Sequence, residues 1–139
     1  MILMKRPIVS RTTCNVFARH TRFALVFTRF SRTFKKALKI ISTEDQIFVS
    51  VASLWEIAIK NSIGKLDLEF SIEEIENLCN EKDITILQIN GKQLDKIKLL
   101  PKIHSDPFDR LIIAQAQTEE LTILTTDSKI PKYPVKTLW

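Results

Sequence analysis

The stretch "QIFVSVASLWEIAIKNSIGK", residues 46–65, changes its hydrophobic period half-way along. Its first six residues form a short, mostly apolar segment rich in β-branched side chains, which is typical of a strand buried on both faces. From Ser53 onward, apolar residues recur at helical spacing, and Gly64 is a natural C-terminal stop. The stretch therefore predicts a buried strand over 46–51 and an amphipathic helix over 53–65.

The same alternation continues along the rest of the chain. Ser71 and Glu74 have the spacing of a capping box, which predicts a helix with Ile72, Ile75, Leu78 and Cys79 on one face. This helix covers residues 71–82. The other elements expected are the end of a helix at 34–42, a strand at 84–89, a helix at 92–100, a helix within 104–116, a strand at 121–126 and the closing segment 135–139. Strands separated by helices predict an α/β fold in which a parallel sheet carries helices on both faces.

The charges divide the chain unequally. Residues 1–43 hold ten Lys or Arg and no Asp or Glu, whereas the other 96 residues hold eleven basic and sixteen acidic side chains. A basic arm on an acidic body is open to three interpretations: a nucleic-acid-binding tail, an organelle transit peptide, or a segment foreign to the fold.

Composition excludes several other classes. The chain of 139 residues fits one domain with a workable core, and its 45% hydrophobic content is that of a globular protein. The apolar run at residues 23–27 is far too short to span a bilayer. Cys14 and Cys79 lack metal-ligand spacing, so we expect reduced thiols and a cytoplasmic location. Two glycines are too few for a Gly-rich phosphate loop.

Acidic residues recur where strands and helices meet. Glu56 follows the strand at 46–51, Asp106 and Asp109 open the helix before the strand at 121–126, and Asp127 follows that strand. In open parallel sheets, ligands bind beyond the carboxyl ends of the strands. Hard oxygen ligands without Cys or His suit Mg²⁺ or Mn²⁺.

Each acid also has a purely structural interpretation. Glu56 stands three residues after Ser53, the spacing of a capping box, which taken alone is the favoured reading. Asp106 before Pro107 has the sequence of an N-cap followed by proline at the first helical position.

The remaining candidates divide in the same way. Asp109 would be a third helical residue, where the helix dipole favours an acid without any metal. Asp127 would cap a turn. His104 is interpreted as a loop histidine, because a single histidine without a partner rarely marks a metal site. Individually these interpretations prevail, but the acids fall together on one expected side of the sheet.

Three motifs in order, "VSVASLWEIAIKNSIGKLDL", "HSDPFDRLIIAQA" and "LTILTTD", resemble a VapC-type PIN-domain protein over roughly residues 34–139. The resemblance implies a three-layer α/β/α sandwich with a central parallel sheet. It also implies a metal-dependent endoribonuclease, the toxin of a toxin–antitoxin pair, acting on RNA, forming a homodimer and silenced by a cognate antitoxin.

The resemblance also implies roles for individual residues. Glu56, Asp109 and Asp127 match the family's second, third and fourth acids, which hold Mg²⁺ or Mn²⁺ and carry out catalysis. Thr125 and Asp106 match supporting positions, and a capping role suits Asp106 better than ligation. Lys60 and Arg110 are candidate contacts to RNA phosphate. A bound metal would lower the pKa of a water molecule and offset charge on the scissile phosphate.

The family's first acid is absent, since no Asp or Glu precedes Glu44. Codons for residues 15–27 can be chosen so that reading one nucleotide later gives Thr-Tyr-Leu-Leu-Asp-Thr-His-Ala-Leu-Leu-Trp-Phe, which resembles the missing motif. We therefore interpret residues 1–33 as an atypical, frameshifted segment and residues 34–139 as the PIN-like domain, with a disrupted first strand. The missing acid leaves open an inactive copy.

Two alternatives follow from these observations. One is a catalytically dead PIN-fold module that still binds RNA or an antitoxin. The other is a nucleic-acid-binding protein in which the basic arm, residues 1–43, carries the function, with a marked salt dependence of binding.

Overall fold

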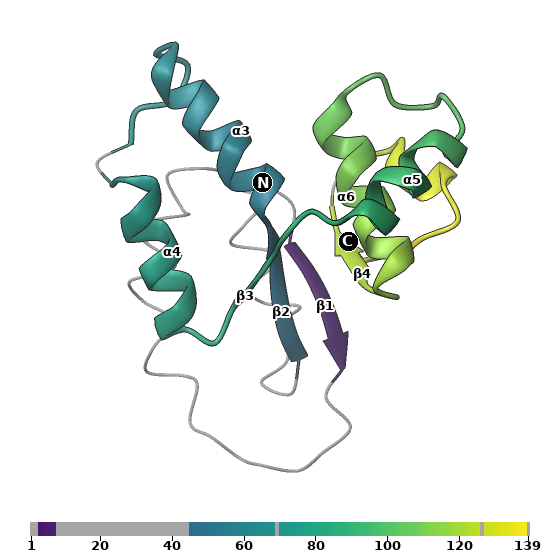
Figure 1. The fold of residues 1–139 in the computed structure, drawn as a ribbon, viewed down its shortest axis with the longest axis horizontal. Helices are drawn as coiled ribbons and strands as arrows, with labels where there is room; N and C mark the ends of the chain where they lie inside the picture. Colours follow the sequence, from purple (N-terminus) through teal and green to yellow (C-terminus); the bar gives the residue numbers. More distant parts are fainter. Residues whose placement is uncertain (1–2, 8–44, 69, 126, 139) are drawn as a thin grey trace.

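The computed structural model describes residues 3–7, 45–68, 70–125 and 127–138 (Figure 1). The elements are β1 (Leu3–Pro7), β2 (Asp45–Ser50), α3 (Val51–Ser62), α4 (Ile72–Glu81), β3 (Thr85–Leu87), α5 (Gly91–Leu99), α6 (Pro107–Thr118), β4 (Thr122–Leu124), the 3₁₀ helix η1 (Ile130–Lys132) and β5 (Lys136–Leu138). This mixture of helices and parallel strands confirms the α/β class. Within these ranges, no helix has the length and apolar character needed to cross a membrane.

Some expectations concern residues outside the described ranges. They are the helix end at 34–42, the boundary between residues 33 and 34, and the thiol of Cys14.

The five strands form one sheet in the order β3-β2-β1-β4-β5. β2 pairs with β3 in parallel, and β4 pairs with β5 in parallel. β1 lies between β2 and β4 and runs antiparallel to both, with Met4 opposite Phe48 on one side and Ile123 on the other (Figure 1). The expectation of a parallel sheet therefore holds for the two outer pairs and fails at the centre. Side chains alternate in strands of either direction, so hydrophobic pattern cannot fix the direction of β1.

The junction of β2 and α3 is tighter than the sequence predicts. The helix begins at Val51, directly after the last strand residue, and the side chain of Ser50 accepts a hydrogen bond from the backbone N–H of Ala52. The expected start at Ser53 is wrong, because Ser50 serves as both strand end and N-cap. Gly64, with φ +70°, follows the helix end as predicted.

Local capping signals fix the next two helices. At α4, the Ser71 side chain accepts from the backbone N–H of Glu74, and Glu74 accepts from that of Ser71, which confirms the predicted capping box. Asn90 and Gln93 form an equivalent pair at the start of α5. These reciprocal bonds satisfy backbone donors that the first helical turn would otherwise leave unpaired.

Two apolar clusters pack on opposite faces of the sheet. Neighbouring residues of β2 enter different clusters, Val49 the first and Phe48 the second, because successive strand side chains point to opposite faces. Figure 1 shows α3 and α4 beside one face and α5 and α6 beside the other. The first cluster contains Val49, Leu54, Ile57, Ile75, Cys79, Ile84 and Leu124; the second contains Met4, Phe48, Leu100, Ile112, Ile113, Ala114, Ala116, Leu121, Ile123, Ile130 and Tyr133.

Candidate metal centre

A buried histidine lies between two aspartates at the centre of the candidate site. The Nδ1 atom of His104 is 3.2 Å from Oδ2 of Asp109, and its Nε2 atom is 3.2 Å from Oδ2 of Asp127. The side chain of His104 is only 8% exposed. Two acids that are distant along the chain therefore meet across one imidazole ring.

Asp109 is held by the start of α6. Asp106 is the N-cap, and its Oδ1 accepts from the backbone N–H groups of Phe108, at 2.8 Å, and Asp109, at 3.2 Å. Pro107 occupies the first helical position, where a missing N–H is tolerated. The predicted capping role of Asp106 is confirmed: Asp106 caps α6 and so fixes the turn that carries Asp109.

Asp127 is held by the turn that follows β4. The hydroxyl of buried Thr125 accepts from the backbone N–H of Asp127 at 3.0 Å, and Oδ1 of Asp127 accepts from the backbone N–H of Lys129 at 2.7 Å. This N–H from Lys129 is the main reason why the pKa of Asp127 is lowered, and the nearby His104 acts in the same direction. Asp127 is thus kept ionised, with Oδ2 directed at His104.

The electrostatics of Asp109 differ from those of Asp127. Burial raises the pKa of Asp109; His104 opposes this, whereas Asp106, Asp127 and Glu56 raise the pKa further. A half-buried acid surrounded by three others is disfavoured in its charged form unless a cation compensates. Glu56 therefore lies within electrostatic reach of Asp109, although it comes from a different helix.

The donor set of this cluster fits a divalent cation. One ligand atom each from His104, Asp109 and Asp127 can be chosen so that all three lie within 4.8 Å of one another. Carboxylate oxygen and imidazole nitrogen are both common ligands of divalent metals. The structure thus brings together Asp109 and Asp127, two of the three predicted ligands, with His104.

Glu56 stands at the edge of the cluster. Its Oε1 is 2.6 Å from Nζ of Lys60, four residues along α3. It is not part of a capping box, because Ser53 lies inside the helix and is buried. The structure thus overturns the capping-box interpretation of Glu56 and pairs its carboxylate with Lys60 along the helix.

The two basic residues expected to contact RNA differ in their surroundings. Lys60 is exposed on α3 and pairs with Glu56. Arg110 instead donates to four backbone carbonyls, those of Ile97, Leu100, Pro101 and His104, at 2.8 to 3.4 Å. These contacts make Arg110 an organiser of the loop before α6, while an RNA contact by either residue stays a prediction.

Two residues of the centre escaped the sequence analysis. The sequence pattern predicts a loop role for His104 and no role for Tyr133. The Tyr133 hydroxyl accepts from the backbone N–H of His104 at 2.7 Å and donates to the carbonyl of Pro101 at 3.1 Å. The presence of His104 in the same motif as Asp106 and Asp109 could have indicated a role at the site. The contact with Tyr133 joins residues 29 apart in sequence, so no local pattern indicates it.

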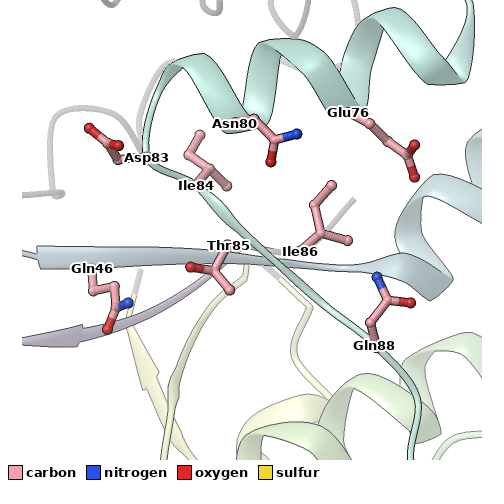
Figure 2. A pocket seen from close by; sticks show the side chains of 8 residues that line it. All are labelled: Gln46, Glu76, Asn80, Asp83, Ile84, Thr85, Ile86 and Gln88. Carbon is pink, nitrogen blue, oxygen red and sulfur yellow. The ribbon is translucent and has the colours of Figure 1, made fainter.

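A separate hollow of about 680 Å³ lies along β3 and α4 (Figure 2). Its described lining is Gln46, Glu76, Asn80, Asp83, Ile84, Thr85, Ile86 and Gln88. None of the predicted site residues belongs to that lining. Two carboxylates without a basic side chain among these eight residues make it unsuited to RNA phosphate.

Comparison with known families gives one match. Residues 21–136 match the PIN domain family, described as "PIN domain". The match begins within the segment interpreted as atypical and ends at Lys136, the first residue of β5. No curated protein and no solved structure matches the chain.

Proposed function

This chain belongs to the PIN domain family, whose members are generally nucleases, and on that premise we propose that it is an endoribonuclease of the VapC toxin type that depends on a divalent metal. The observation that carries this proposal is the meeting of Asp109 and Asp127 at His104. The ordered motifs around Glu56, Asp109 and Asp127 support the VapC type.

In this proposal, Asp109 and Asp127 hold the ion, Mg²⁺ or Mn²⁺, and Glu56 adds a third carboxylate within electrostatic reach. A metal held by these residues would lower the pKa of a bound water and offset charge on the scissile phosphate. Asp106 and Thr125 keep Asp109 and Asp127 in position through the backbone hydrogen bonds of their turns.

The substrate in this proposal is single-stranded or looped RNA. Lys60 is the better of the two candidate phosphate contacts, because its side chain is half exposed on α3, whereas Arg110 is engaged with carbonyls. A cognate antitoxin, a homodimer and a cytoplasmic location complete the VapC-type proposal. Sedimentation velocity of the purified chain tests the dimer.

The first strand bears on whether this copy is active. β1 occupies the centre of the sheet with the residues LMKRP, which include no acid. In a frame-restored chain we expect a parallel, acid-bearing strand in this position and a complete three-layer sandwich. The nucleotide sequence of the gene tests this: the frameshift hypothesis fails if no one-base shift encodes the Asp-Thr-His motif.

The activity test is cleavage of single-stranded RNA with Mg²⁺ or Mn²⁺. We expect metal-dependent cleavage by the unchanged chain that Asp109→Asn abolishes and Asp95→Asn preserves, since Asp95 is exposed and pairs with Lys98 on α5. No cleavage by the unchanged chain, with retained RNA or antitoxin binding, favours the catalytically dead module.

A further inference from the structure

His104 has a buried nitrogen without a hydrogen-bond partner. Among the residues that the structure describes, Nε2 of His104 forms no hydrogen bond, although Oδ2 of Asp127 is 3.2 Å away. The pair is an ion pair only if the imidazole is protonated. Buried polar atoms in folded proteins are nearly always satisfied, so this atom requires an explanation.

The two ring nitrogens face chemically identical neighbours. A neutral imidazole carries one N–H donor and one acceptor lone pair. If Nδ1 carries the proton toward Asp109, the lone pair of Nε2 faces the Asp127 carboxylate, which is also an acceptor. Two acceptors at this separation repel each other unless a cation intervenes. That cation is either a second ring proton, which makes the ring an imidazolium, or a metal ion bound near both atoms.

We propose that Nε2 of His104 is a metal ligand alongside the carboxylates of Asp127 and Asp109, so that the centre selects a first-row transition metal such as Mn²⁺ over Mg²⁺. The inference rests on the proposed function for the existence of a metal centre, and goes beyond it in the donor set and the ion. Mg²⁺ strongly prefers oxygen ligands, whereas imidazole raises the affinity for transition metals.

The surroundings of His104 suit a ligand that must stay in place. Tyr133 binds its backbone N–H, and Arg110 donates to its carbonyl. Oδ2 of Asp109, 3.2 Å from Nδ1, is a second carboxylate oxygen close to the ring. The centre also receives no carboxylate from residues 1–43, which contain none, so a nitrogen donor adds to a short set of oxygens.

The direct test is pulsed electron paramagnetic resonance of the full chain loaded with Mn²⁺. Coordination by His104 gives ¹⁴N modulation of the Mn²⁺ signal, which disappears in His104→Asn. Modulation that is absent from the unchanged chain overturns the inference. This negative result needs no variant, so the inference can be overturned even if substitutions of the buried histidine impair folding.

One variant, titrated with two ions, assigns the role to one nitrogen. Asparagine can keep a donor near the position of Nδ1 while removing Nε2. We expect His104→Asn to weaken Mn²⁺ binding by roughly tenfold or more in calorimetric titration, and Mg²⁺ binding by less than about threefold. Equal effects on the two ions overturn the inference, because His104 would then serve only to orient Asp109.

The same titrations separate this inference from the proposed function. If Mn²⁺ binds with loss only in Asp109→Asn and Asp127→Asn, the carboxylate centre stands and the role of His104 falls. If neither Mn²⁺ nor Mg²⁺ binds the unchanged chain at millimolar concentration, both fall. Asp95→Asn serves as the control, since Asp95 is exposed on α5, pairs with Lys98 and lies outside the cluster of His104, Asp109 and Asp127.

Discussion

The rings of Trp55 and Phe108 meet edge to face, with their centroids 5.3 Å apart and their planes at 81°. Trp55 precedes Glu56 on α3, and Phe108 precedes Asp109 on α6. The aromatic contact therefore joins the two helices whose acids influence each other electrostatically. Ring pairs of this kind contribute about 0.5–1.5 kcal/mol beyond the area they bury.

Trp55→Ala should lower the free energy of unfolding by about 1 kcal/mol, mainly through loss of this contact, because the Trp55 side chain is 58% exposed. Urea unfolding followed by circular dichroism measures the change. Ile63→Ala is the control, since Ile63 follows the same helix and is equally exposed, and it should change stability by less than about 0.5 kcal/mol. Equal losses in the two variants would show that the ring contact contributes nothing.

Arg110→Ala should destabilise the protein by about 2–4 kcal/mol. The guanidinium donates to four carbonyls at the end of α5 and in the loop up to His104. A hydrogen bond from a charged group contributes about 1.5–3 kcal/mol net, and four bonds made by one side chain are not additive. Thermal or urea unfolding measures this loss.

Two variants give this prediction its controls. Arg110→Lys should recover little stability, because an ammonium group cannot reproduce the planar fork of donors. Lys60→Ala should lose less than about 1 kcal/mol, since it breaks one exposed ion pair. Unchanged stability in Arg110→Ala, together with lost RNA affinity, would instead support the phosphate contact expected from the sequence.

The parts of this structure that the sequence predicts correctly rest on local chemistry. The caps formed by Ser71 with Glu74 and by Asp106 with Pro107 are specified within four residues, so their signals survive in any tertiary context. Ser50 and Ser53 show the limit of this reasoning. Both can cap a helix, and the sheet decides between them by carrying strand pairing up to Ser50.

The candidate site was predictable in part for the same reason. Asp109 lies in a motif with its own cap, but the environment of His104 depends on Asp127 and Tyr133, which are far away in sequence. The direction of β1 depends on pairing with β2 and β4, which no hydrophobic pattern within residues 3–7 encodes. The environment of His104 and the direction of β1 were therefore not predictable, because both depend on residues far away in sequence.

The buried thiol of Cys79 should make stability fall at alkaline pH. Burial, with a smaller effect of the Glu76 charge, raises the pKa of Cys79 from 9.0 to about 11. Below pH 9 the thiol is protonated in both states and has no effect. Between pH 9 and 11 the unfolded chain releases the proton and the folded chain does not, so unfolding is favoured by about 1.4 kcal/mol per pH unit.

Cys79→Ala isolates this effect from the titration of lysines and tyrosine. The unchanged chain should be the more stable at pH 8, because alanine leaves part of the first cluster unfilled. Its advantage should shrink steadily between pH 9 and 11 in urea unfolding measured at several pH values. A constant difference across that range would mean that the thiol titrates normally.

A substitution at Met4 tests how much β1 contributes to the stability of the sheet. Its side chain is fully buried in the second cluster, and its neighbours across the two ladders are Phe48 and Ile123. Met4→Ala should therefore lower the free energy of unfolding by about 2–4 kcal/mol, as for other large-to-small changes in a core. Leu99→Ala, at a side chain that is 78% exposed, provides the matched control with little expected change.

A double-mutant cycle between Met4 and Ile123 makes the test specific for the central strand. Residues in direct contact couple by about 0.5–3 kcal/mol, so Met4→Ala and Ile123→Ala should not be additive in urea unfolding. If Ile123→Ala is destabilising while Met4→Ala is neutral and uncoupled, residues 3–7 do not fill the centre of the sheet. That outcome would favour the frameshift hypothesis, because the position between β2 and β4 would then need a strand that the present reading frame does not encode.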